Sequence, residues 1–89
     1  MIDPLLGAVR RDRIADDLWT LVNVPSPTTH ERAAAFTFAE LLGAAGVDVA
    51  IDETLRDSPN VIGRLRGALG EGPTIQLAGH LDHIDVPHP

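Results

Sequence analysis

Apolar residues recur at helical spacing in the first quarter of the chain. This first stripe comprises Ile14, Leu18, Leu21 and Val22. Its spacing predicts a helix over residues 4–22, with Asp3 as N-cap, Pro4 at the first helical position and Trp19 as a packing residue. The segment 24–27, Val-Pro-Ser-Pro, ends this helix because each proline disfavours helical backbone in the residue before it.

A second apolar stripe follows a helix-start pattern. Thr28 and Glu31 stand three residues apart, the spacing at which two side chains cap a helix N-terminus reciprocally. The stripe behind them comprises Ala34, Ala35, Phe38, Leu41, Leu42 and Ala45. We therefore predict a second helix that ends at Gly43 or Gly46, since glycine is a common C-terminal stop.

After residue 46, large apolar residues alternate strictly with small or polar residues, and the helical spacing ends. Apolar side chains occupy every second position of residues 47–51, which predicts a strand with one buried face, and residues 61–66 repeat the pattern. The connection 53–59 is too short for a helical crossover, so an antiparallel pair is expected. A third and more apolar strand is predicted at Thr74–Ala78, after a glycine-rich linker. Two helices followed by three strands indicate an α/β class fold that is incomplete at this length.

Composition restricts the function classes. The 89 residues carry 7 Arg and no Lys against 13 Asp and Glu, a net charge of −6, and they lack the basic face that nucleic-acid binding needs. No stretch reaches the roughly 18 apolar residues of a membrane span, and charged residues interrupt the N-terminus where a signal peptide would be apolar. We therefore expect a cytoplasmic location and neither a nucleic-acid nor a membrane partner. Cysteine is absent, so any metal would be held by His and carboxylates.

Side chains that could bind a metal or take part in catalysis gather in the segment 79–85, directly after the predicted third strand. In extended backbone, His80 and Asp82 share a face, so the carboxylate can hold the imidazole of a metal-binding histidine. Gly79 would let the backbone approach a ligand closely. The local pattern fits a polar strand end turning into solvent equally well, and it leaves both interpretations open.

The order of four motifs resembles one enzyme family. The motifs are Leu21-Val22-Asn23-Val24-Pro25-Ser26-Pro27 with Glu31 behind it, the Gly46-Val47 turn, the strand of residues 60–67, and Gly79-His80-Leu81-Asp82. Together they resemble the zinc-dependent metallopeptidases that include acetylornithine deacetylase, succinyl-diaminopimelate desuccinylase, aminoacylase and the glutamate-releasing carboxypeptidases. The resemblance covers nearly the whole chain and identifies residues 1–89 as the incomplete N-terminal segment of such a catalytic domain.

The resemblance implies a metal site and a reaction. His80 is similar to the family's first zinc ligand, and Asp82 to the site carboxylate that orients this imidazole. His83 and Asp85 depart from the family's usual residues and receive no role. The complete enzyme would hold two zinc ions, with cobalt or manganese as substitutes, and could form a homodimer. It would hydrolyse an amide bond in an N-acyl amino acid or small peptide, whereas the 89 residues alone are expected to be inactive.

Two other functions stay open on the sequence. The chain could be a non-catalytic remnant or an interaction fragment, because the family's remaining ligands and general base would lie beyond it. A metallo-β-lactamase-like hydrolase is disfavoured, since Ala78 stands where that motif requires its first histidine. Ser26 lacks the glycines of a nucleophile elbow and is interpreted as a loop residue, while His30 and His88 are interpreted as solvated.

Overall fold

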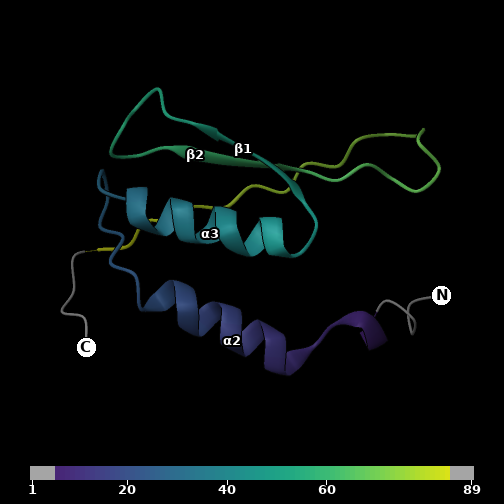
Figure 1. The fold of residues 1–89 in the computed structure, drawn as a ribbon, viewed down its shortest axis with the longest axis horizontal. Helices are drawn as coiled ribbons and strands as arrows, with labels where there is room; N and C mark the ends of the chain where they lie inside the picture. The colour runs from purple at the N-terminus through teal and green to yellow at the C-terminus, as the bar shows by residue number, and fades with distance from the viewer. Residues whose placement is uncertain (1–5, 85–89) are drawn as a thin grey trace.

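A computed structural model describes residues 6–84. It contains helices α2 (Arg11–Val22) and α3 (Arg32–Ala44) and strands β1 (Asp48–Asp52) and β2 (Asn60–Arg64). Helix α3 lies at the centre, with the β1–β2 hairpin on one side and α2 on the other (Figure 1). The general expectation of a mixed helix and strand fold is confirmed. Across residues 6–84, no helix is long and apolar enough to cross a lipid bilayer.

The first helix is shorter than its apolar spacing predicts. Residues 6–8 form one helical turn, but the backbone becomes extended at Arg10 (φ −106°, ψ 108°), and α2 begins only at Arg11. The continuous helix predicted from Pro4 is therefore wrong, and the predicted Asp3 cap lies outside the described residues. Gly7 is a weak helix former, and residues 6–11 are all exposed. Packing thus does not compensate for the poor propensity of this segment.

The apolar stripe of α2 is mainly exposed. Trp19 is 72% exposed, and Ile14, Leu18 and Val22 are each more than half exposed. The prediction of Trp19 as a packing residue is wrong. Among the described elements, α2 contacts only α3, and only Asp17 and Leu21 of α2 become half-buried. One neighbour covers one side of a helix, so the rest of the stripe faces solvent.

The start of α3 does not use the predicted capping box. The helix begins at Arg32 with Glu31 as N-cap, and no side chain caps it. Thr28 and Glu31 instead bond to distant residues: the Thr28 hydroxyl donates to Asp82 and the Glu31 carboxylate accepts from Ser58. Spacing along the chain predicts local capping only, and here contacts between distant segments satisfy both side chains.

Arg32 ties the start of α3 to the β1–β2 loop. Its guanidinium donates to the Arg56 carbonyl at 2.9 Å and pairs with Glu53 at 2.8 Å. Its backbone N–H donates to the Asp57 carbonyl at 3.1 Å. These contacts fix the loop against the helix start and bring Ser58 to Glu31.

Gly46 ends α3 as the sequence predicts. Its φ of +87° lies in the left-handed region that favours glycine. The N–H groups of Gly46 and Val47 donate to the carbonyls of Gly43 and Leu42 at 3.0 and 3.1 Å. This pair of bonds is a Schellman motif. Gly43, the other predicted stop, lies inside the helix.

Alanine at these two glycines is expected to change stability in opposite directions. Gly46→Ala places an L side chain in left-handed backbone, which costs roughly 1–2 kcal/mol. Gly43→Ala adds a Cβ that meets nothing within 4 Å, and it gains up to about 1 kcal/mol of helix propensity. Urea unfolding followed by far-UV circular dichroism measures both changes. Equal effects of the two variants would contradict the assignment of the helix end.

The predicted hairpin is confirmed. Strands β1 and β2 pair antiparallel, with Asp48 opposite Arg64 and Asp52 opposite Asn60. The Asp52 carboxylate begins the connecting loop by accepting hydrogen bonds from the hydroxyl and backbone N–H of Thr54 at 2.6 and 3.0 Å. These bonds, led by that of the hydroxyl, lower the pKa of the Asp52 carboxyl.

The third predicted strand does not form. Residues 74–78 pass along α3 as irregular backbone (Figure 1), and among the described residues they make no backbone–backbone hydrogen bond. Ile75 and Leu77 are 84% and 93% exposed. An apolar run becomes a strand only beside a partner, and β1 is the sole strand paired with β2 in the described chain. Residues 6–84 therefore contain two strands, β1 and β2, where the sequence predicts three.

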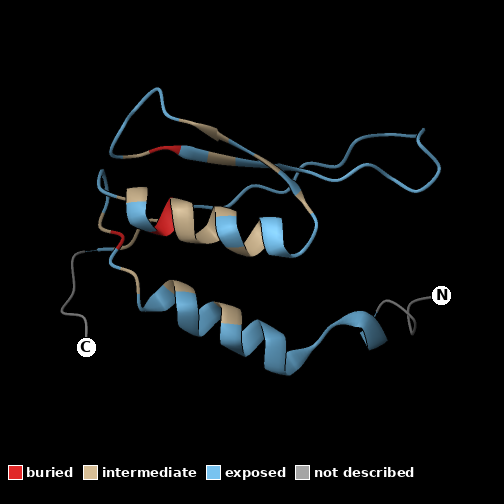
Figure 2. Ribbon diagram, in the orientation of Figure 1, coloured by how far each residue is buried: buried red, intermediate tan, exposed pale blue. Residues whose placement is uncertain are grey.

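Few residues are buried. Within residues 6–84 these are Ser26, Ala34, Ala35 and Pro59 (Figure 2). They lie at the start of α3 and in the loops beside it. The best-packed part of the chain is thus the region that positions the segment of residues 80–83.

Candidate metal site

The segment that carries His80 and Asp82 is held against the loop before α3. Pro27 and His83 form a parallel bridge. The His83 N–H donates to the Ser26 carbonyl at 2.9 Å, and the Thr28 N–H donates to the His83 carbonyl at 3.3 Å. These bonds bring the loop of residues 26–28 beside residues 82 and 83, more than fifty positions later in the sequence.

His80 and Asp82 form a hydrogen-bonded pair. The distance from His80 Nδ1 to Asp82 Oδ1 is 2.9 Å, and Nδ1 also lies 3.1 Å from the Asp82 carbonyl oxygen. Both oxygens are acceptors, so Nδ1 is the donor, and in the neutral form of such a ring Nε2 keeps its lone pair. The His80 side chain is 85% exposed, compared with 30% for Asp82. Nε2 is therefore presented to solvent as an available ligand atom.

Thr28 supports the other oxygen of the same carboxylate. Its hydroxyl donates to Asp82 Oδ2 at 2.7 Å. This hydrogen bond lowers the pKa of the Asp82 carboxyl, and the bond from His80 lowers it further. The ionised carboxylate thus accepts one bond from each neighbour. Sequence spacing predicts the link between His80 and Asp82, but it assigns Thr28 to the helix cap.

His83 has a structural role that the sequence does not indicate. Its Nε2 accepts the Ser26 N–H at 3.0 Å, while its Nδ1 donates to the Ile84 carbonyl, 2.6 Å away. The ring therefore connects residues 57 positions apart, and no local spacing signals such a contact. Ser26 is 2% exposed, and it lies in the loop that the two prolines predict.

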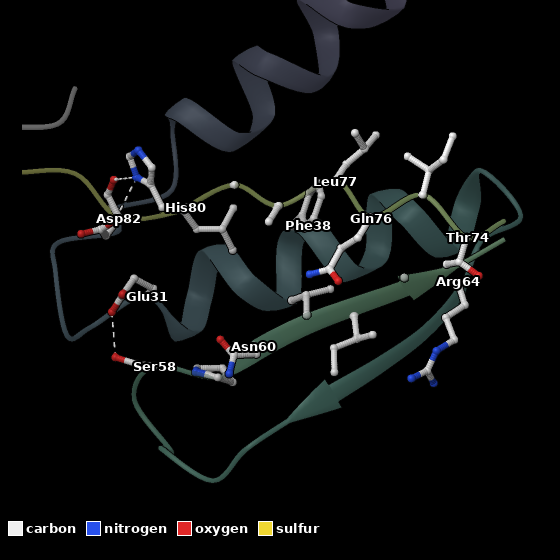
Figure 3. A pocket seen from close by; sticks show the side chains of 18 residues that line it. Glu31, Phe38, Ser58, Asn60, Arg64, Thr74, Gln76, Leu77, His80 and Asp82 are labelled. Carbon is white, nitrogen blue, oxygen red and sulfur yellow. Dashed lines mark hydrogen bonds and ion pairs between the residues drawn. The ribbon is translucent and has the colours of Figure 1, made fainter.

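A groove of about 1120 Å³ runs between β2 and residues 74–82. His80 and Asp82 lie at one end, together with Glu31 and Ser58, and Thr74 and Arg64 lie at the other (Figure 3). Phe38 of α3 contributes to its lining. Glu31 accepts the Ser58 hydroxyl at 2.8 Å, so its carboxylate is directed to the β1–β2 loop.

The candidate site supplies one ligand position. Residues 6–84 contain no group of three or more His, Asp or Glu side chains arranged to hold a metal ion. A catalytic zinc ordinarily takes three protein ligands and a water. The donor chemistry of His80 fits one of these positions, while Asp85 and His88 lie outside the described residues.

The sequence is similar to that of a curated dipeptidase. The chain is 34% identical over 86 residues to a cysteinylglycine-S-conjugate dipeptidase from Corynebacterium striatum. The match covers 89% of this chain but 18% of the dipeptidase, so the chain spans less than a fifth of that curated relative. No protein-family model and no solved structure matches the sequence.

Proposed function

We propose that this chain is the N-terminal segment of a zinc-dependent peptidase, with His80 as a zinc ligand and Asp82 as its supporting carboxylate. The observation that carries this proposal is the 2.9 Å bond between His80 Nδ1 and Asp82 Oδ1. Histidines that ligate metals commonly donate their second ring N–H to a carboxylate, which fixes the ring and increases its basicity. The similarity to a dipeptidase supports the same reaction class.

The chain's own residues prepare the ligand. Asp82 holds the proton on Nδ1 and limits rotation of the imidazole, so Nε2 can bind a cation without a prior tautomer change. Exposure of His80 leaves room for further ligands from other parts of a longer protein. When bound, zinc would supply a Lewis acid for the scissile carbonyl and lower the pKa of a water.

The substrate in this proposal is a dipeptide or an N-acyl amino acid. The relative's name specifies a dipeptidase, and both substrate types present an amide bond to a metal-activated water. A non-catalytic fragment is the second candidate, favoured by the single ligand position in residues 6–84. No observation favours the metallo-β-lactamase-like alternative.

A hybrid enzyme tests the proposal. These 89 residues would replace the matched segment of the C. striatum dipeptidase, and dipeptides and N-acyl amino acids would be assayed. We expect the isolated chain to hydrolyse neither substrate type, with or without zinc, because residues 6–84 supply one ligand position. The hybrid should hydrolyse dipeptides, lose activity to a chelator and regain it with zinc.

Two results would contradict the proposal. Zinc-dependent turnover by the isolated chain would show that the site is complete without further segments. A folded hybrid that binds zinc and leaves every substrate intact would favour the non-catalytic interpretation. The unmodified dipeptidase, assayed in parallel, confirms that substrates and conditions are adequate.

A further inference from the structure

Thr28 does not have the helix-capping role that its position in the sequence predicts. It stands in capping-box register with Glu31, yet α3 begins four residues later and receives no side-chain cap. Its hydroxyl donates instead to Asp82, 54 positions away, at 2.7 Å. Thr28 thus does not cap α3 but bonds to the carboxylate beside the candidate ligand His80, and this contact needs its own explanation.

Backbone contacts hold Thr28 at this carboxylate. The Thr28 N–H donates to the His83 carbonyl, and the His83 N–H donates to the Ser26 carbonyl. The His83 ring adds a third connection by accepting the Ser26 N–H at 3.0 Å. Since the loop is already fixed on both sides, the hydroxyl reaches Asp82 with little further loss of backbone entropy.

The side chains form a directed series of hydrogen bonds. Thr28 Oγ1 donates to Asp82 Oδ2, and His80 Nδ1 donates to Asp82 Oδ1 at 2.9 Å. A carboxylate held at one oxygen cannot rotate freely, so its second oxygen stays aimed at the imidazole. Without the hydroxyl, Asp82 keeps its charge but loses this restraint.

From this geometry we infer that Thr28 is a positioning residue for His80, acting through Asp82 to fix which ring nitrogen carries the proton. The expected effect on zinc binding rests on the proposed function, whereas the expected effect on the His80 tautomer does not. Thr28 itself is not a ligand. It orients the carboxylate that orients the ligand.

The test measures the tautomer of His80 directly. Long-range ¹⁵N–¹H correlation spectra of the histidine-labelled chain distinguish Nδ1–H from Nε2–H, at about pH 8, where an imidazole is ordinarily neutral. We expect Nδ1–H to dominate for His80 in the natural chain. Thr28→Val removes only the hydroxyl and should give a mixture of tautomers, whereas Thr28→Ser should restore the natural spectrum.

The chain offers a matched control and an internal reference. Thr54→Val removes a hydroxyl that donates to Asp52 at 2.6 Å, far along the chain from His80, and should leave the His80 spectrum unchanged. The His83 tautomer is set by Ser26 and Ile84. It should stay Nδ1–H in Thr28→Val, which separates a specific effect on His80 from general loosening.

Zinc affinity of the hybrid enzyme gives the second readout. Loss of an outer partner of a metal ligand typically costs about 10–100-fold in affinity. Thr28 is one hydrogen bond further from the metal than Asp82 is. Thr28→Val should therefore weaken zinc binding by about tenfold, the lower end of this range. Thr28→Ser should restore the affinity.

The outcomes separate this inference from the proposed function. An unchanged His80 tautomer in Thr28→Val, or loss of the preferred tautomer in both His80 and His83, would overturn the inference. A specific tautomer change in the chain, together with a hybrid that binds no zinc, would uphold Thr28 as a positioning residue and contradict the proposed function instead.

Discussion

Replacing His80 with alanine in the hybrid enzyme is expected to reduce its zinc content outright, whereas replacing Asp82 with alanine is expected to reduce turnover and spare the metal. His80→Ala removes the ligand atom itself. Asp82→Ala leaves Nε2 able to bind, but it frees a ring now held by a 2.9 Å hydrogen bond. Loss of such a partner typically costs about 10–100-fold in metal affinity or activity.

Metal analysis beside a rate assay separates these two roles. At saturating zinc, the Asp82→Ala protein should retain nearly full occupancy with a turnover lowered by about 10–100-fold. His30→Ala is the control for histidine removal, since His30 is exposed and its imidazole bonds only to the neighbouring Thr29 hydroxyl among the described residues. Asp52→Ala is the matched control for removing a hydrogen-bonded carboxylate, because Asp52 bonds to Thr54.

Normal activity of Asp82→Ala would show that the carboxylate does not support the ligand. Full zinc content in His80→Ala would remove this histidine from the metal site. Each result concerns one residue, so the two assignments can fail separately.

Local features of this fold were predictable from the sequence. The end of α3 at Gly46 follows from glycine's access to left-handed backbone, and the β1–β2 hairpin follows from alternation and a short connection. The proximity of His80 and Asp82 follows from their spacing. In each case the residues that decide the outcome are neighbours in the sequence.

Features that depend on distant residues were not predictable. Thr28 and Glu31 have the spacing of a capping box, but their side chains form hydrogen bonds with Asp82 and Ser58 instead. The contact of His83 with Ser26 likewise has no local signal. A hydrogen-bonding side chain is satisfied by whichever partner the folded chain brings nearest, and sequence spacing reports only local partners.

The failed third strand shows a different limit. Residues 74–78 have the apolar composition of a central strand, and composition predicts how a segment behaves once it has neighbours. In the described chain they have no partner strand, so their backbone groups and two large side chains remain open to solvent. Whether such a segment becomes a strand depends on a partner strand, which the segment itself cannot encode.

The isolated 89-residue chain is therefore expected to be marginally stable and to self-associate through residues 74–78. Ile75 and Leu77 are 84% and 93% exposed, and the backbone beside them is free to pair with a second copy. The net charge of −6 opposes this contact, so salt, which screens the repulsion, should strengthen the association.

Sedimentation velocity over a range of protein and salt concentrations measures this association. Leu77→Lys places a charge in the apolar segment and should shift the chain toward monomer. Leu69→Lys makes the same charge change at a residue that is 87% exposed but lies in the turn of residues 67–70, and it should associate like the natural chain. A natural chain that stays monomeric and melts cooperatively, independent of concentration, would show that α3 and the hairpin stabilise it without a partner for residues 74–78.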